Sequence, residues 1–233
     1  MIALSLAEIA AATSGRVVLA GDATPDTLVD GYVDTDSRKI APGDVFVAKP
    51  GEATDGHNFV GAARDAGAAL ALVEREVDVA IPQIVVTDVV AAIAELARDV
   101  VARVRAGGEL RVIGITGSNG KTTTKNMLRR ILEDEGETVA PIASYNNAVG
   151  APLTMLRVRE STKYLICELG ADAPGQIARL AGLVTPDVGV VLMVGLSHAG
   201  GFGGIEHTAR AKRELIEQVR PGGVAVLNAD EHR

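Results

Sequence analysis

The chain has 233 residues, of which 47% are apolar and 23% are charged, as in a typical soluble globular protein. Its formal net charge of −7 argues against a broad surface for nucleic acid or for an anionic membrane, so an anionic ligand would have to be held by a local site. The single cysteine, Cys167, excludes an internal disulfide, and no apolar run approaches the length that inserts into a membrane. Because Glu8 interrupts the first apolar stretch, we expect no secretory signal and predict a cytoplasmic protein.

The first hundred residues are predicted to form a small α/β unit. Helical spacing covers residues 5–14, 57–68 and Val89 to Arg105. Short runs bounded by turn residues predict strands at 16–21, 31–38, 44–48 and 69–74. The two glycines of AGGE, residues 106–109, end the long helix just before a new strand begins. We therefore predict two domains, residues 1–106 and residues 107–233.

The second domain has a different pattern, in which nearly continuous apolar strands alternate with helices. The strands are predicted at 111–116, 138–142, 164–170, 187–195 and 223–228, and the helices at 121–135, 174–183 and 205–219. Strands that are buried on both faces and alternate with helices indicate a doubly wound, mostly parallel sheet. Ligands of such sheets bind beyond the carboxyl ends of the strands, here after Thr116, Glu168 and Gly195.

The segment GITGSNGKTTTK, residues 114–125, lies at the first of these strand ends. The common phosphate loop has a glycine five residues before its Gly-Lys pair, but here that position is Ile115. Free backbone N–H groups at a helix start favour an anion, Lys121 would reach terminal phosphates, and the Thr122 hydroxyl would bind magnesium. The alternative is an ordinary glycine turn with an exposed lysine. The following helix is predicted to present one apolar face, made by Met127, Leu128, Ile131 and Leu132.

The segment TGSNGKTT resembles the nucleotide loop of the Mur ligases, the ATP-dependent peptide-bond-forming enzymes of peptidoglycan precursor synthesis. The resemblance implies a P-loop-type ATPase domain that uses ATP and Mg²⁺. It also implies that one continuous stretch holds the nucleotide: Thr116, Gly117, Ser118, Asn119, Gly120, Lys121, Thr122 and Thr123.

Polar residues follow the next strands as well. Asn146 and Asn147 of SYNNAVGAP resemble the family's substrate-side motif, although such a pair before a glycine is often a turn. Glu168 ends an otherwise apolar strand, where an acid is costly unless it meets a cation or a donor. The resemblance implies that Glu168 binds magnesium together with Thr122; a buried, hydrogen-bonded structural glutamate is the alternative. His198 of GLSHAGGFGG resembles the family histidine that helps to hold a second magnesium ion.

Lys212 falls on the predicted apolar stripe of the last helix, which consists of Ile205, Ala209, Ile216 and Val219. A lysine in such a stripe either extends its amine to solvent or has a functional role. The segment ARAKRE resembles the family position whose lysine is carbamylated to become an anionic metal ligand. On this reading Lys121, Glu168, His198 and Lys212 form the catalytic set.

Residues 34–74 resemble the uridine-binding N-terminal domain of two Mur ligases, which implies that the Ser37-Arg38 turn and DGHNF bear on a UDP substrate. The residues of the second segment are Asp55, Gly56, His57, Asn58 and Phe59. Surface turns followed by a helix start are the alternative reading.

Within the family, ELGADAPGQIARL at 168–180 resembles the member that adds D-alanyl-D-alanine to UDP-N-acetylmuramoyl-tripeptide. The alternatives are the preceding ligase, which adds a diamino acid to UDP-N-acetylmuramoyl-dipeptide, and a binding module without turnover. Because the family has a third, C-terminal domain, we expect this chain to be a truncated piece that is inactive by itself. We also expect a monomer.

Overall fold

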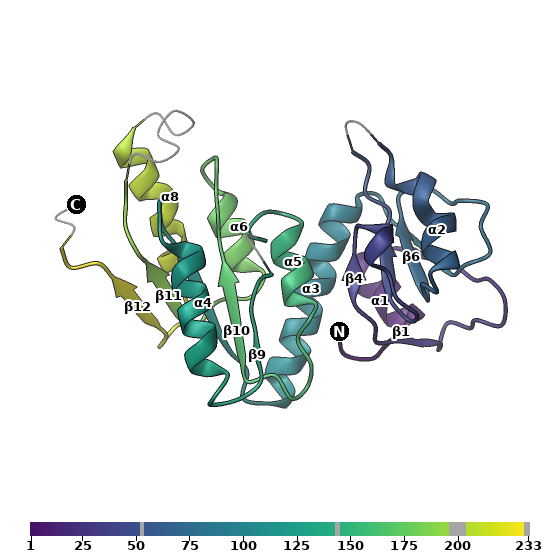
Figure 1. Cartoon of the computed structure of the whole chain (residues 1–233), viewed down its shortest axis with the longest axis horizontal. Helices are drawn as coiled ribbons and strands as arrows, with labels where there is room; N and C mark the ends of the chain where they lie inside the picture. Colours follow the sequence, from purple (N-terminus) through teal and green to yellow (C-terminus); the bar gives the residue numbers. More distant parts are fainter. Residues whose placement is uncertain (52–53, 143–144, 196–203, 231–233) are drawn as a thin grey trace. The chain divides into compact units, whose positions relative to one another are not determined.

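The computed structural model describes residues 1–51, 54–142, 145–195 and 204–230. The chain divides into two compact units, Met1–Val100 and Val101–Arg233, which are described separately here (Figure 1). The division falls inside helix α3 (Val89–Gly107), whereas the predicted domain boundary lies at the end of this helix. In the described ranges, no helix is long and apolar enough to cross a membrane.

The first unit is built on a five-stranded sheet in which β7, β6, β5 and β4 are parallel and β2 is antiparallel to β7. Strands β1 and β3 form a separate antiparallel pair. The strands are β1 (Leu4–Ser5), β2 (Arg16–Val18), β3 (Leu28–Val29), β4 (Val33–Asp34), β5 (Val45–Val47), β6 (Leu70–Val73) and β7 (Gln83–Val85). The helices are α1 (Leu6–Thr13) and α2 (Val60–Asp65), with 3-10 turns η1 (Ser37–Lys39) and η2 (Gly56–Phe59).

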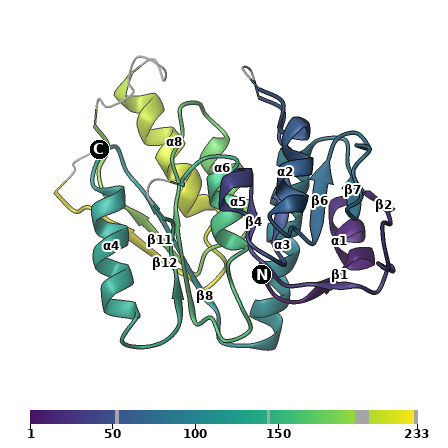
Figure 2. The same ribbon diagram turned by 45° about the vertical axis from the view of Figure 1, so that its right-hand side comes forward.

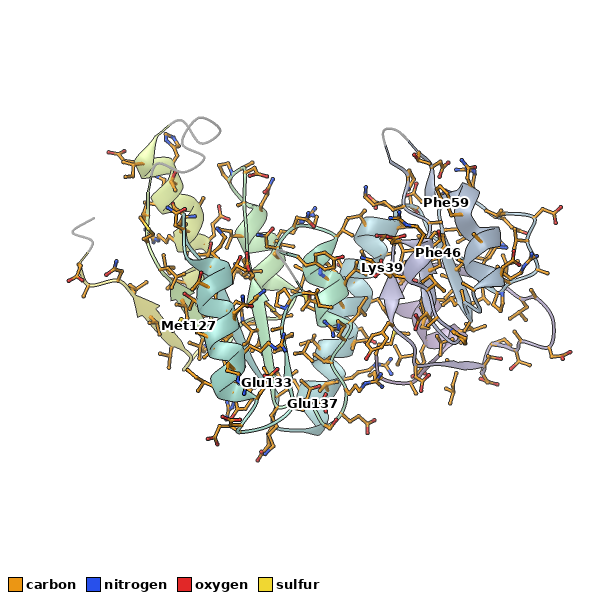
Figure 3. The ribbon with its side chains drawn as sticks, viewed as in Figure 1. Lys39, Phe46, Phe59, Met127, Glu133 and Glu137 are labelled. Carbon is orange, nitrogen blue, oxygen red and sulfur yellow. The ribbon has the colours of Figure 1, made fainter. Side chains whose placement is uncertain are left out.

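Local sequence explains where α1 begins, and apolar burial explains how the sheet is covered. The Ser5 hydroxyl accepts from the Glu8 N–H, and the Glu8 carboxylate accepts from the Ser5 N–H, which is a capping box. Phe46 of β5 is fully buried in a cluster with Val60 of α2 (Figure 3). The predicted α/β character of this unit is therefore present in the structure.

The second unit contains a five-stranded sheet in the order β12-β11-β8-β10-β9, and every neighbouring pair is parallel. The strands are β8 (Arg111–Thr116), β9 (Thr138–Val139), β10 (Tyr164–Glu168), β11 (Val188–Val191) and β12 (Val224–Leu227). The helices are α4 (Lys121–Leu132), α5 (Gly150–Met155), α6 (Gln176–Gly182) and α8 (Ile205–Glu217). The prediction of a doubly wound parallel sheet is confirmed.

Helices cover both faces of this sheet (Figure 2). Ile113 and Ile115 of β8 pack with Leu128 of α4 on one face. Gly114 lies between them on the strand and faces the opposite side, where Leu215 of α8 is its nearest neighbour. Because successive strand residues alternate in direction, α4 and α8 must lie on opposite faces.

The predicted apolar face of α4 is partly wrong. Met127 and Ile131 are each 63% exposed (Figure 3), whereas Leu128 and Leu132 pack against the sheet. The third inward residue is Lys125, which is only 2% exposed. Lys125, Leu128 and Leu132 follow helical spacing, so the buried stripe is rotated from the predicted one and includes a cation.

An ionic cluster fixes the amino end of β11, at the end of the sheet away from Glu168. The Asp187 carboxylate accepts from the Val112 N–H at 2.7 Å and from the Arg105 guanidinium at 3.1 Å. The Arg220 guanidinium forms an ion pair with it at 2.8 Å. The Asp187 side chain is 7% exposed, so this charge depends on its partners.

We expect Asp187→Asn to lower the free energy of unfolding by about 1–2 kcal/mol, because the amide keeps an acceptor for Val112 but loses the charge that pairs with the arginines. Urea denaturation would measure the loss. An unchanged unfolding free energy would contradict a stabilising role for this cluster.

Candidate nucleotide-binding and catalytic site

The loop between β8 and α4 has the geometry that its glycines allow. Gly120 precedes α4 with φ of 83°, a left-handed conformation that favours glycine. A Cβ at Gly117 would lie 3.0 Å from the Leu192 Cβ, so the backbone passes close to the end of β11. Asn119, Gly120 and Thr123 are exposed. The predicted nucleotide loop is thus an accessible turn at the start of a helix.

Two side chains of this loop have structural roles that sequence reasoning did not predict. The Thr116 hydroxyl donates to the Leu169 carbonyl at 2.9 Å. The Ser118 hydroxyl donates to the Gly195 carbonyl at 3.2 Å and accepts from the Gly195 N–H at 2.8 Å. Both residues are buried. They attach the loop to the ends of β10 and β11, so their contribution to a ligand would come from the backbone.

Lys121 is the first residue of α4 and lies over its own loop. Its ammonium donates to the Gly117 carbonyl at 2.7 Å. A neutral carbonyl leaves the positive charge of this lysine uncompensated, which suits an anion above the loop.

Glu168 is the point at which three segments meet. Its carboxylate is 1% exposed and accepts from the Thr122 hydroxyl at 3.1 and 3.2 Å. It also accepts from the Asn146 amide at 3.0 Å. The structure therefore brings together the predicted metal residues Thr122 and Glu168 and the predicted substrate residue Asn146, at the carboxyl end of β10.

Asn146 and Asn147 form hydrogen bonds with different segments of the chain. The backbone carbonyl of Asn146 accepts from the Gly170 N–H at 3.0 Å. A Cβ at Gly170 would lie 3.0 Å from the side chain of Asn146. Asn147 instead orders the turn before α5, because its Oδ1 accepts from the N–H groups of Val149 at 3.1 Å and Gly150 at 2.9 Å. Asn147 therefore orders the turn before α5, and Asn146 contacts the candidate catalytic glutamate.

Lys212 lies on the buried face of α8, but this face differs from the predicted one. Its buried members are Thr208, Ala211, Lys212 and Leu215, whereas Ile205, Ala209 and Ile216 are half-buried. Lys212 is 8% exposed, so its amine does not extend to solvent. Burial, and secondarily the positive charge of Lys121, lowers the pKa of Lys212 to about 8. No hydrogen bond or ion pair joins Lys212 to the residues that the structure describes.

Lys125 is a buried cation that sequence reasoning missed. Its ammonium donates to the Pro141 carbonyl at 3.0 Å, which links α4 to the segment that follows β9. Its position four residues after Lys121, in register with Leu128 and Leu132, was the available signal.

Two other predictions concern metal binding and the core. His198 lies outside the described residues. Across the ranges that the structure describes, no group of three His, Cys, Asp or Glu side chains could hold a metal by itself. Cys167 is buried, as expected, and burial raises the pKa of its thiol to about 12.

In the first unit, the two candidate substrate segments follow the carboxyl ends of parallel strands. Turn η1 follows β4, turn η2 follows β5, and α2 contacts η1. Asp36 caps η1 by accepting from the Arg38 N–H at 3.1 Å, and its carboxylate also accepts from the Arg38 guanidinium at 2.8 Å. The side-chain hydrogen bond from Arg38 is the main cause that lowers the pKa of Asp36 to about 2. Ser37 and Arg38 thus lie on an ordered turn.

In the second segment, the His57 ring points into the protein. The ring is 2% exposed; Nδ1 lies 2.6 Å from the Asp55 carboxylate, and Nε2 accepts from the Glu74 N–H at 2.9 Å. The His57 backbone N–H and the Arg75 guanidinium hold the pKa of Asp55 well below its usual range. Because both nitrogens of the His57 ring have internal partners, this residue shapes the turn, whereas Asn58 and Phe59 are exposed (Figure 3).

Comparison with known proteins agrees with this geometry. The Mur ligase middle domain matches residues 115–233, and the Mur ligase family, catalytic domain matches residues 32–108. The chain belongs to the Mur ligase family.

The relatives that the chain matches carry the names of individual ligases within this family. The chain is 42% identical over 255 residues to UDP-N-acetylmuramoyl-tripeptide--D-alanyl-D-alanine ligase of Mycobacterium leprae, an alignment that covers 99% of this chain and 49% of the relative. UDP-N-acetylmuramoylalanyl-D-glutamyl-2,6-diaminopimelate--D-alanyl-D-alanyl ligase of Acinetobacter baumannii superposes with a TM-score of 0.82 and 37% identity, covering 96% of this chain and 48% of that one. MurF ligase of Thermotoga maritima in complex with ADP gives a TM-score of 0.76 at 33% identity, covering 87% and 46%. The chain spans about half the length of the curated relatives it matches.

Proposed function

We propose that this chain carries the ATP-binding and UDP-substrate-binding parts of a ligase that adds D-alanyl-D-alanine to UDP-N-acetylmuramoyl-tripeptide. The observation that carries the proposal is the hydrogen bond of Thr122, the residue after Lys121, to Glu168 at the carboxyl end of a parallel strand in a Mur ligase middle domain. The names of the relatives support the choice of substrates.

On this proposal, the loop from Gly117 to Thr123 holds the phosphates of ATP. Backbone N–H groups at the start of α4 point at the anion, and Lys121 neutralises terminal phosphate charge. In the relative from Thermotoga maritima the bound nucleotide is ADP, which supports a nucleotide site of this kind.

The donor set around Glu168 fits magnesium. Thr122 and Glu168 offer hard oxygen ligands that already lie within 3.2 Å of each other. Magnesium usually takes only one or two carboxylates and completes its shell with water and phosphate oxygens, so Glu168 would be a sufficient acidic ligand. When bound, magnesium supplies positive charge that offsets the charge on the transferring phosphoryl group. His198 and a carbamylated Lys212 are the proposed ligands of a second ion.

The proposed chemistry has two steps. A carboxylate oxygen of the acceptor peptide attacks the γ-phosphorus of ATP, and ADP leaves, which gives an acyl phosphate. The amine of D-alanyl-D-alanine then attacks the acyl carbon; phosphate leaves, the amine loses a proton, and an amide forms. Lys121 would stabilise the charge of the first step, and Glu168 would orient Thr122 and Asn146 around the reacting groups.

The first unit is proposed to hold the UDP moiety, within an N-terminal domain of residues 1–106. Ser37, Arg38, Asn58 and Phe59 are the candidate contacts, and Asp55, Gly56 and His57 shape the turn between them. We also infer a monomer that acts in the cytoplasm, where ATP is available.

Calorimetry of this 233-residue chain with UDP-N-acetylmuramoyl-tripeptide and with the corresponding dipeptide tests the proposal. The account predicts tighter binding of the tripeptide. Preference for the dipeptide would favour the preceding ligase. If neither UDP compound bound to the chain, the proposed function would be contradicted.

A further inference from the structure

The second unit has a cavity of about 480 Å³ whose lining includes residues just after the candidate catalytic glutamate in the chain. Its lining includes Asn147, Gly170, Asp172 and Arg179, and the apolar side is closed by Leu180. Gly170 is two residues beyond Glu168 along the chain. A molecule whose reacting group lies at Glu168 could therefore extend into this cavity, which we call the Arg179 pocket.

Two donors of the Arg179 pocket have no acceptor among the residues that the structure describes. Arg179 is an exposed residue of α6, and its guanidinium has no ion pair or hydrogen bond to any residue that the structure describes. Asn147 uses its Oδ1 to accept from two backbone N–H groups, of Val149 and Gly150. This orientation leaves its Nδ2 as a donor without a partner among the described residues. A guanidinium and an amide with free N–H groups form a recognition set for a carboxylate.

The wall that carries Arg179 is held in place independently of any ligand. Glu214 of α8 accepts from the Gly175 N–H at 2.6 Å and from the Ala178 N–H at 3.0 Å. The Gln176 side chain accepts from the Asp172 N–H at 3.0 Å, which orders the segment before α6. Arg179 therefore projects from a fixed helix, and little ordering would be needed when a ligand binds.

We propose that the Arg179 pocket binds a non-reacting carboxylate of the acceptor peptide, through Arg179 and Asn147. This inference rests on the proposed function. The relative from Acinetobacter baumannii is named for an acceptor with D-glutamyl and 2,6-diaminopimelate residues, and both residue types carry carboxylates besides the one that forms the new amide. Asp172 at the rim would meet an amino group of the same peptide.

Binding measurements with Arg179→Gln and Arg179→Lys test the proposal. Because a charge-assisted hydrogen bond contributes about 1.5–3 kcal/mol, Arg179→Gln should weaken UDP-N-acetylmuramoyl-tripeptide binding about tenfold or more, and Arg179→Lys should recover part of the loss. Binding of UDP-N-acetylmuramic acid, which lacks the peptide, and of Mg–ATP should not change. Arg130→Gln, on the exposed side of α4, is the matched control and should bind all three compounds normally.

Asn147→Asp provides a second variant that does not depend on Arg179. The aspartate keeps the acceptor for the Val149 and Gly150 N–H groups but replaces the free donor with a negative charge, so peptide binding should again weaken while UDP-N-acetylmuramic acid binds normally. A tripeptide whose glutamyl carboxylate is amidated, compared with one whose third residue is lysine, would identify the carboxylate that is bound.

The outcomes separate this inference from the function on which it rests. Failure of the unmodified chain to bind any UDP compound would overturn the proposed function and this inference with it. Normal tripeptide binding by Arg179→Gln and Asn147→Asp would overturn the pocket alone, and so would a loss confined to Mg–ATP.

Discussion

Replacing Lys121 with alanine should weaken the binding of Mg–ATP on the order of 10- to 100-fold, because a charged donor to phosphate contributes about 1.5–3 kcal/mol. Among the residues that the structure describes, the Lys121 ammonium donates to a neutral carbonyl, that of Gly117, at 2.7 Å, and to no other group. The variant therefore loses little within the free protein and much in the complex. AMP, which lacks the terminal phosphates, should lose much less affinity.

Calorimetry with Mg–ATP, AMP and UDP-N-acetylmuramoyl-tripeptide would test this expectation. Lys163→Ala is a suitable control, since this exposed lysine lies just before β10, at the end of the strand opposite Glu168. UDP-substrate affinity should be unchanged in Lys121→Ala, because Ser37 and Arg38 belong to the other unit. Equal Mg–ATP affinity in Lys121→Ala and the unmodified chain would contradict the assignment of the loop.

Replacing Lys212 with methionine should raise the free energy of unfolding by about 2–3 kcal/mol at pH 7, since one pKa unit corresponds to about 1.4 kcal/mol. Burial lowers the pKa of Lys212 from 10.5 to about 8. The protonated amine therefore destabilises the fold fully below pH 8, and this penalty disappears as the pH rises toward 10.5. The stability advantage of the variant should shrink over the same range.

Urea denaturation at several pH values, in buffer free of carbon dioxide, would measure this difference. Lys163→Met should show no such dependence on pH. The same buried amine, once neutral, can attack carbon dioxide and lose a proton to give a carbamate, so ¹³CO₂ should give a carbamate signal in the unmodified chain that is absent from Lys212→Met. A stability difference that is independent of pH would contradict the burial of a titrating lysine.

Much of the second unit could be predicted from the sequence because its strands are continuous apolar runs. The strand predicted at 111–116 has the same bounds as β8. The helices predicted to begin at residues 121 and 205 are α4 and α8, which begin at those residues. Strands β8 and β10 are buried on both faces over most of their length, whereas β12, at the edge of the sheet, is exposed although its sequence is equally apolar. Predicted helix ends were less accurate, because the last turn of a helix depends on tertiary contacts.

Short elements held by tertiary contacts could not be predicted. Helix α5 begins with Gly150 and contains Pro152, which are poor helix formers, yet all six of its residues are buried. The Asn147 side chain orders the turn that precedes it. Strands β1, β3 and β7 contain only two or three residues each, too few to show a period.

The candidate site likewise contains some features that could be predicted from the sequence and others that could not. The loop at 117–122 could be predicted because a strand, two glycines, a lysine and threonines follow in a fixed order. The spacing of Lys125 with Leu128 and Leu132 was a signal that was missed, and the role of Glu214 depends on packing, because a charged residue on a helix is usually solvated. The inward position of His57 likewise depends on the distant Glu74 N–H.

Backbone amide chemical-shift mapping of the ¹⁵N-labelled chain, titrated with Mg–ATP and separately with UDP-N-acetylmuramoyl-tripeptide, most directly tests the central claim of two distinct sites. The account predicts that Mg–ATP shifts the amides of Gly117 to Thr123 and of Glu168. It predicts that the UDP compound shifts those of Ser37, Arg38, Asn58 and Phe59. If Mg–ATP left the loop after β8 unperturbed, or if both compounds shifted the same single set of amides, the assignment of the two sites would be contradicted.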